Sequence, residues 1–321
     1  MDTEKQKPDI LPSTTNTRLQ ELWELIRQNK LTLMGLTIFV IFFLTAFMGL
    51  FLTSGQNPII NPATIRLQEK LRPPLSRPNM ETLHPDEIPV LGLYLFGTDD
   101  LGRDVFARML QGAWVSLTVG FVAVGISVLV GLVMGGIAGY MGQGRIRWID
   151  TMIMRIVDIM LCFPSFFLIL TVVALLPASI YNIMIVIGLT SWMGTTRFVR
   201  AEFLSLREQE FVIAAKALGV NNFRIIFRHM MPNAVAPVLV SATIGIATAI
   251  LTEAGLSFLG FGVPPPYATW GNILSDGKRF IFDAPWLTFV PGIAILIVVL
   301  SFNLFGEGLR DIVNPKLRRR R

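Results

Sequence analysis

The chain has 321 residues, of which 52% are hydrophobic and 16% are charged, and its net charge is +6. A soluble domain of this size carries about 25% charged residues, and the apolar residues here gather into long blocks. The composition therefore excludes an ordinary soluble protein and predicts an all-α, polytopic membrane protein with about six transmembrane helices. Basic residues cluster at the edges of the apolar blocks, which is typical of orientation signals and argues against a nucleic-acid-binding surface.

The N-terminal 53 residues predict a tail, a surface helix and a first span. Residues 1–30 begin as a polar tail and end in apolar residues at helical spacing over 19–29, which favour an interfacial helix on the cytoplasmic leaflet. Residues 31–53 form an apolar run long enough for a hydrocarbon core of roughly 30 Å. No small-residue cleavage site follows this run in the right place, so we interpret it as a retained span and not as a signal peptide.

Residues 54–112 predict an extracytoplasmic loop. Its middle is rich in proline, which excludes a regular helix or a central strand there. Near its end, Thr98 can cap a helix whose first turn carries Asp99 and Asp100. The acidic residues of this stretch lack the spacing of a cation site, so they predict ion pairs and not a metal site: Asp100 with Arg103, or Asp104 with Arg108.

Residues 113–312 predict a five-helix core with one polar interruption. The expected spans are the apolar runs 114–140, 153–176, 182–195, 234–254 and 287–304. The first run has glycines four residues apart, so another helix can approach that face closely: Gly131, Gly135 and Gly139. Pro164 suggests a kink in the second run. The single cysteine, Cys162, lies in the same run and is expected to be a small buried side chain.

Three charged residues inside the expected spans are candidates for a transport pathway. Arg155 and Asp158 are three residues apart, so they can neutralise each other on one face of a helix. Their expected depth near the inner interface favours a structural pair over a transport role. Glu253 lies at the far end of the fifth expected span, where it can face the pathway or simply reach the outer interface.

Residues 197–233 are polar and mostly basic, and they are patterned as helix. Good helix formers from 202 to 218 predict one helix, and Gly219 is expected to end it in the left-handed conformation. A second short helix is expected after an asparagine cap, with apolar side chains on one face: Phe223, Ile226, Phe227 and Met230. Pro232 is expected to close the unit. Two short helices with exposed apolar side chains suit the groove of another protein.

This segment resembles the cytoplasmic coupling loop of ABC importer permeases. The resemblance rests on Ile213-Ala-Ala-x-x-x-Gly219, followed after nine residues by His229-x-Met231-Pro232. Ile213 stands where the family has an acidic residue, and His229 and Met231 stand where it has a hydrophobic pair. An ordinary pair of amphipathic interfacial helices is the alternative, but such a pair would not require the glycine and the proline at these positions.

A second stretch narrows the resemblance. Gly97–Asp104 (GTDDLGRD) is similar to the sequence before the second span in the C-type permease subunits of oligopeptide and dipeptide importers. The whole resemblance covers about residues 31–316. It implies the ABC type I importer permease fold.

The resemblance also implies partners. The chain would form half of the translocation pathway of a peptide importer, beside a homologous second permease subunit. Two ATP-binding subunits would use ATP and Mg²⁺, and an extracytoplasmic substrate-binding protein would deliver oligopeptide or dipeptide cargo. The residues expected to couple to the ATPase are Phe203, Phe211, Ala214, Ala215, Gly219, Phe223, Phe227 and Pro232. The alternative for Phe223 and Phe227 is packing on the subunit's own helices.

The distribution of basic residues predicts the topology. Six spans place both termini on one side, and lysine and arginine are more numerous around 197–233 and in the tail at 313–321 than on the opposite side. Positive residues favour the cytoplasm, so both termini and the coupling loop are expected there. The basic tail is expected to bind anionic lipid. The resemblance implies the inner membrane of a prokaryotic cell.

No catalytic site, bound cofactor or metal site is expected in this chain. It has no G-x-x-x-x-G-K-[ST] phosphate loop, and His84 and His229 are expected on opposite sides of the membrane. The energy for transport would therefore come from a partner. The alternatives are a permease of the same family for nickel or another small solute, an ion-gradient-driven transporter or channel, and a multi-span enzyme.

Overall fold

The computed structural model describes residues 18–55, 58–81, 83–142 and 146–313, and these are mostly helical. The expected tail at 1–17 and nearly all of the basic tail at 313–321 lie outside the described residues. Within the described ranges, pairing between extended segments is limited to two isolated bridges, Ser76 with Tyr94 and Thr98 with Asp104. The fold class is therefore all-α, as the composition predicts.

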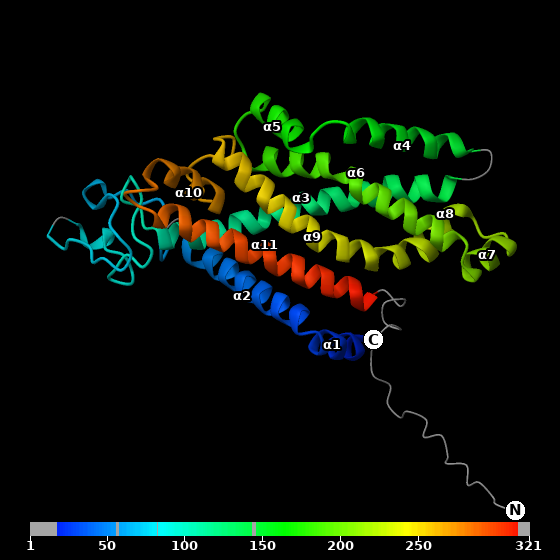
Figure 1. Cartoon of the computed structure of the whole chain (residues 1–321), viewed down its shortest axis with the longest axis horizontal. Helices are drawn as coiled ribbons and strands as arrows, with labels where there is room; N and C mark the ends of the chain where they lie inside the picture. Colours follow the sequence, from blue (N-terminus) through cyan, green and yellow to red (C-terminus); the bar gives the residue numbers. More distant parts are fainter. Residues whose placement is uncertain (1–17, 56–57, 82, 143–145, 314–321) are drawn as a thin grey trace, which may run out of the picture.

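The long helices lie side by side along the longest axis of the molecule (Figure 1). In chain order the helices are α1 (Arg18–Gln28), α2 (Lys30–Thr53), α3 (Val105–Met141), α4 (Arg147–Leu161), α5 (Ser165–Leu175), α6 (Ile180–Arg207), α7 (Glu210–Ala217), α8 (Asn222–Arg224), α9 (Met231–Phe258), α10 (Trp270–Gly277) and α11 (Trp286–Val313). The segment between α2 and α3 lies with α10 at one end of the bundle, which we term the α10 end. The opposite end carries α7 and α8 and is termed the α7 end; α1 and the end of α11 lie toward it.

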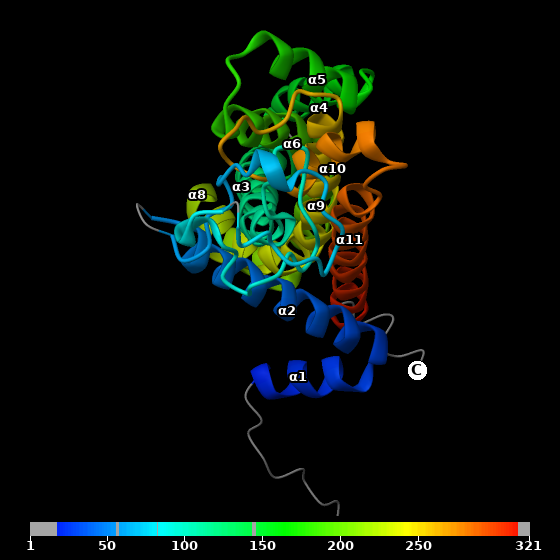
Figure 2. The same ribbon diagram turned by 90° about the vertical axis from the view of Figure 1, so that its left-hand side faces the viewer.

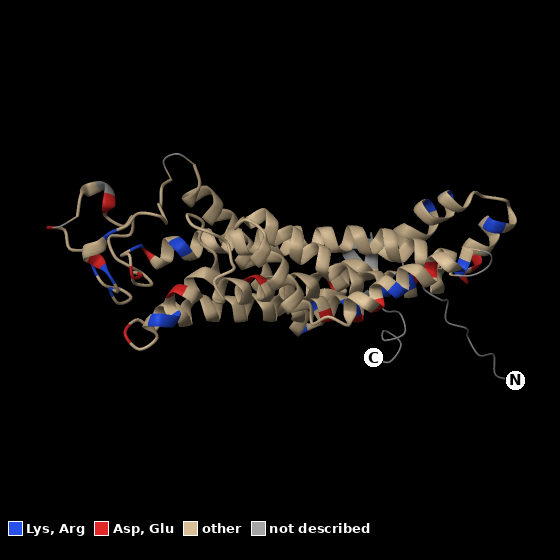
Figure 3. Ribbon diagram, turned by 90° about the horizontal axis from the view of Figure 1, so that it is seen from above, with Lys and Arg blue, Asp and Glu red and all other residues tan. Residues whose placement is uncertain are grey.

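The helices meet the dimensions of a membrane. Four are long and apolar enough to cross one: α2, α3, α9 over Pro237–Phe258, and α11 over Trp286–Ile312. The run expected at 153–176 is broken into α4 and α5, which meet at 83° near Pro164 and count as a fifth crossing if taken together. The run expected at 182–195 is the apolar first half of α6, whose 28 residues extend about 42 Å. Charged residues gather toward the two ends of the molecule (Figure 3).

α3 begins earlier than its apolar run suggests. Its first residue is Val105, so the loop expected over 54–112 ends at Asp104. Asp104 caps the helix, and its Oδ1 accepts the backbone N–H of Phe106 at 2.9 Å. The predicted cap at Thr98 is wrong because the chain first makes a tight turn through Gly102, whose φ of +71° is easily adopted by glycine.

Thr98 instead fastens the loop to itself and to the bundle. Its Oγ1 accepts the backbone N–H of Arg72 at 2.8 Å and donates to the carbonyl of Glu69 at 2.5 Å. Its own carbonyl accepts the indole N–H of Trp286, the first residue of α11, at 3.2 Å. These bonds join parts of the chain up to 188 positions apart.

A buried aspartate organises the charged residues at this end. Asp99 is 0% exposed, and its Oδ2 lies 2.7 Å from both Arg103 and Arg108. Arg108 also bonds to Asp276 of α10 at 3.0 Å. The ion pairs expected from neighbouring sequence positions are therefore wrong: Asp100 with Arg103, and Asp104 with Arg108. Both arginines bind Asp99 instead, and their second partner, Asp276, comes from α10, which sequence spacing does not reveal.

α3 is the central helix, with α2, α6 and α9 packed around it (Figure 2). The glycine face predicted on α3 is where α6 approaches. A Cβ at Gly135 would lie 2.6 Å from the carbonyl oxygen of Thr196, and one at Gly139 would lie 2.5 Å from the Cβ of Phe203. The contact therefore requires glycine at these positions.

The glycine contact yields a stability prediction. Replacing Gly139 with alanine should destabilise the protein by about 1–3 kcal/mol, because α6 must move to admit the methyl group. The measurement is the thermal unfolding midpoint of the full chain in detergent. Gly125→Ala in the same helix is the matched control, because a Cβ there meets nothing within 4 Å. Equal midpoints for both variants would contradict the close contact.

The cap of α3 yields a pH prediction. Burial raises the pKa of Asp104 from 3.8 to about 6. The folded protein thus holds this proton more tightly than the unfolded chain, so Asp104 contributes more stability as the pH falls through 6 and less as it rises.

Asp104→Asn keeps an oxygen acceptor for the cap but cannot titrate. The unfolding midpoint of this variant, relative to the wild type, should rise between about pH 4 and about pH 7. A difference that stays constant over this interval would show that Asp104 does not titrate there.

Candidate functional site

The segment 197–233 folds into a compact unit at the α7 end (Figure 1). α6 continues to Arg207, the chain breaks at 208–209, and α7 follows, so the single helix expected over 202–218 is wrong. The break turns Val212 into the interior, where it is fully buried. Gly219 ends α7 with a φ of +72°, as predicted.

Pro232 does not close the unit. α8 leads into a π-helical turn, Ile225–Met230, which continues directly into α9. Pro232 lies in the first turn of α9, where a missing N–H costs little. The expected stop is therefore wrong, because the helical path passes through the proline.

A small hydrophobic core joins the unit to the membrane helices. Its buried members come from α6, α7, the π-helical turn and α9: Val199, Phe203, Val212, Ala215, Ile225, Ile226, Met230, Ala234 and Val238. Phe203 is 0% exposed, and its ring covers Gly136 of α3. The prediction that Phe203 enters the groove of another protein is therefore wrong, because the glycine face of α3 takes its side chain. Ala215 is buried in the same core.

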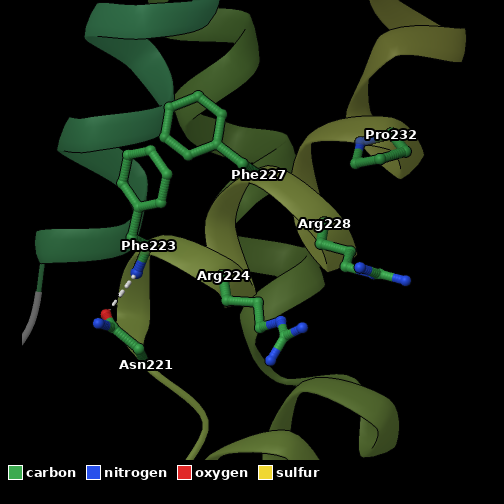
Figure 4. Close-up of a pocket in the computed structure, with 6 residues that line it drawn as sticks. All are labelled: Asn221, Phe223, Arg224, Phe227, Arg228 and Pro232. Atoms are coloured by element: carbon green, nitrogen blue, oxygen red, sulfur yellow. Dashed lines mark hydrogen bonds between the residues drawn. The ribbon is translucent and has the colours of Figure 1, made fainter.

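Two aromatic rings remain on the outside. Phe223 and Phe227 are 68% and 49% exposed, and their ring centroids lie 4.4 Å apart. They line an open pocket of about 720 Å³ together with Asn221, Arg224, Arg228 and Pro232. In Figure 4 the two rings lie side by side while both arginines point away from them. The backbone N–H of Phe223 donates to Asn221 Oδ1 at 3.0 Å, which fixes the start of α8.

The structure divides the expected apolar face of the second short helix into buried and exposed residues. Phe223, Ile226, Phe227 and Met230 were expected to share one face, but Ile226 and Met230 are buried while both phenylalanines face outward. The π-helical turn departs from the 3.6-residue period on which the expectation depended. Phe211 and Ala214 of α7 are also exposed.

Tyr140, at the end of α3, contacts the unit at the α7 end, and the sequence analysis did not predict this contact. Its hydroxyl donates to Asn222 Oδ1 at 2.5 Å, and the Lys216 ammonium group lies 5.4 Å from the centre of its ring. Tyr140 thus contacts both α7 and α8. A tyrosine at the end of an apolar span is ordinarily an interface anchor, so its position alone gave no reason to single it out.

The charged residues inside the bundle have different partners from those expected. Asp158 of α4 pairs with Arg197 of α6 at 2.5 Å and not with Arg155. Asp150 of α4 likewise pairs with Arg200 of α6, at 2.5 Å. The expected pair is wrong because α6 lies alongside α4 and presents its own guanidinium groups.

Glu253 is 0% exposed, so it does not face an open pathway in this structure. It accepts a hydrogen bond from the Ser257 hydroxyl, one turn further along α9, at 2.7 Å. The expectation that Glu253 reaches the outer interface stays a prediction. Its surroundings are the packed junction of α3, α9 and α10.

Comparisons with known proteins assign this architecture. The chain is 42% identical to the dipeptide transport system permease protein DppC of Alkalihalophilus pseudofirmus, over 99% of this chain and 100% of that protein. It is 38% identical to the oligopeptide transport system permease protein OppC of Bacillus subtilis, over 91% of this chain and 88% of that one. It is 35% identical to DppC of the same organism, over 96% and 88%.

A solved structure has the same fold. A chain from an inward-facing structure of the MetNI methionine ABC transporter superposes with a TM-score of 0.52 at 19% identity, covering 65% of this chain and 98% of that one. Residues 127–319, which include the unit at the α7 end, match the model of the family described as binding-protein-dependent transport system inner membrane component. The chain therefore belongs to this family of inner membrane transport components.

Proposed function

We propose that this chain is a permease subunit of an ATP-driven importer of dipeptides or oligopeptides. The observation that carries the proposal is the exposed pair of rings, Phe223 and Phe227, held on a unit that is itself packed against α6 and α9. Support for a peptide cargo comes from the relatives, which are permease proteins of dipeptide and oligopeptide transport systems.

The exposed rings are suited to bind an ATPase subunit. An exposed aromatic pair is costly in water, and full burial of one large apolar side chain contributes roughly 1.5–3 kcal/mol. Arg224 and Arg228 flank the rings and can meet acidic side chains at the rim of a groove. The pocket therefore offers an apolar centre with a basic margin, as expected of a protein interface.

The small hydrophobic core can transmit movement of the ATPase contact to the long helices. A push on α7 or α8 is transmitted to α6 through Phe203 and to α9 through Ala234 and Val238, because interiors are close-packed and deform little. When the ATPase subunits bind ATP and close, they would move the unit as a rigid body, and the ends of α6 and α9 would move with it. This chain would supply the moving helices, and ATP binding and hydrolysis by the partner subunits would supply the energy.

The full assembly follows from this role. The chain would pair with a homologous second permease, bind two ATP-binding subunits that use ATP and Mg²⁺, and receive cargo from an extracytoplasmic substrate-binding protein. The α7 end and both termini would face the cytoplasm, since basic residues are concentrated there. The α10 end, with the folded segment between α2 and α3, would face the substrate-binding protein.

The coupling role predicts the effect of removing the rings. The double variant Phe223→Ala, Phe227→Ala should weaken binding of the ATPase subunits by about a hundredfold, because each lost ring removes roughly 1.5 kcal/mol of apolar burial. ATP-driven uptake of a labelled dipeptide into proteoliposomes that contain the complete transporter should fall with it. Both quantities are measured on the same preparation.

The control is Phe282→Ala, because Phe282 is 95% exposed but lies at the α10 end, in the connection before α11. It should leave ATPase binding unchanged. Uptake driven by an ion gradient without ATP would replace the proposal with a different class of transporter. Normal ATPase binding by the double variant would show that coupling uses another surface.

A further inference from the structure

α4 presents three distinct faces. At 100° per residue, its buried residues Asp150, Ile153 and Val157 form one face. A second face is exposed and apolar: Trp148, Met152, Ile156 and Ile159, continued by Phe163. A third face is exposed and polar: Thr151, Arg155 and Asp158, continued by Cys162. The helix thus separates its exposed surface into an apolar stripe and a polar stripe.

The polar stripe is built into the fold by α6. Arg197 binds Asp158 at 2.5 Å, and both side chains are about half exposed, at 53% and 50%. Beside this pair, Arg155 is exposed and makes no ion pair with the described residues. Cys162, expected to be buried, is exposed and donates through its Sγ to the carbonyl of Asp158 at 3.2 Å.

The charges of the pair argue against lipid as its surroundings. Arg197 lies ten residues before the end of α6, about 15 Å along the helix axis. A charged side chain facing hydrocarbon at such a position is strongly unfavourable, and such residues face a water-filled cavity or protein. The apolar stripe, about 90° away around α4, is the face suited to lipid.

We infer that the polar stripe of α4, together with Arg197, is this subunit's wall of the aqueous translocation pathway, with Arg155 as the positive charge available to a carboxylate of the cargo. The inference rests on the proposed import function and specifies which surface the cargo passes. Two guanidinium groups against one carboxylate leave the stripe with a net positive charge. A hydrated peptide with a free carboxylate matches that charge.

Accessibility to a charged, membrane-impermeant thiosulfonate tests the wall, since its reaction requires a thiolate in water. The chain's only cysteine is Cys162, so the wild type reports one stripe position, and Thr151→Cys in a Cys162→Ser background reports another. The depth-matched controls are Phe163→Cys and Met152→Cys in the same background, each one residue away on the apolar stripe. Modification is read by mass on this chain in the complete transporter, with reagent on both sides of the membrane.

The polar-stripe cysteines should react at least about tenfold faster than their apolar neighbours. Equal rates within each pair of neighbours would overturn the inference. ATP-driven uptake is measured in the same proteoliposomes. If the polar-stripe cysteines react faster but there is no ATP-driven uptake, the proposed importer function is wrong and the aqueous wall stands. If uptake is normal but the rates are equal, only the inference about the wall is wrong.

The charge of the wall has its own test. Arg155→Glu should slow ATP-driven dipeptide uptake severalfold, whereas Arg155→Lys, which keeps the positive charge, should leave uptake near the wild-type rate. In both variants the loaded substrate-binding protein should stimulate ATP hydrolysis as it does in the wild type. Loss of that stimulation in both variants would show that Arg155 has a structural role. Normal uptake by Arg155→Glu would also overturn a role for its charge.

Discussion

The contact between α3 and α6 is possible only because α3 has no side chains where α6 crosses it. At Gly135 and Gly139 a single methyl group would collide with the backbone or the Cβ of α6. Bare backbone against backbone maximises dispersion contacts, which drive helix association where the solvent is itself apolar. Phe203 uses the same face, because its ring covers Gly136. The helix that bears the unit at the α7 end is thus fixed to the central helix of the bundle.

Two further arrangements depend on that fixed position of α6. Its C-terminal end anchors α7 and the π-helical turn through a small shared core, which leaves Phe223 and Phe227 outside. Its middle carries two arginines, Arg197 and Arg200, that hold α4 through Asp158 and Asp150. α6 therefore positions both the surface proposed to bind the ATPase subunit and the surface proposed to face the cargo. A change in the tilt of α6 would move both together.

Features that depend on local sequence were predictable. The apolar runs gave the long helices, the glycine spacing gave the face of α3 that α6 approaches, and Gly219 marked the end of α7. Each of these follows from the chemistry of residues within one or two helical turns.

Features that depend on a second helix were not predictable. Asp158 has a neighbour of opposite charge at three residues' distance, yet it bonds to α6, and Asp99 binds arginines that also reach α10. Phe203 is buried because α3 lacks side chains where it packs, and Cys162 is exposed where α4 ends and the chain bends by 83° into α5. Ile226 and Met230, expected on the same face as Phe223 and Phe227, are buried because the π-helical turn interrupts the regular period.

α9 connects the two ends of the molecule without an interruption. Its first turns belong to the core of the unit at the α7 end, and near its other end Glu253 and Ser257 lie in the junction with α10. Because α9 is one continuous helix packed into both of these regions, their orientations depend on each other. If ligands at both ends discriminate between two orientations of this helix, each must change the affinity of the other by the same factor. α9 is therefore a direct structural link between the α7 end and the α10 end.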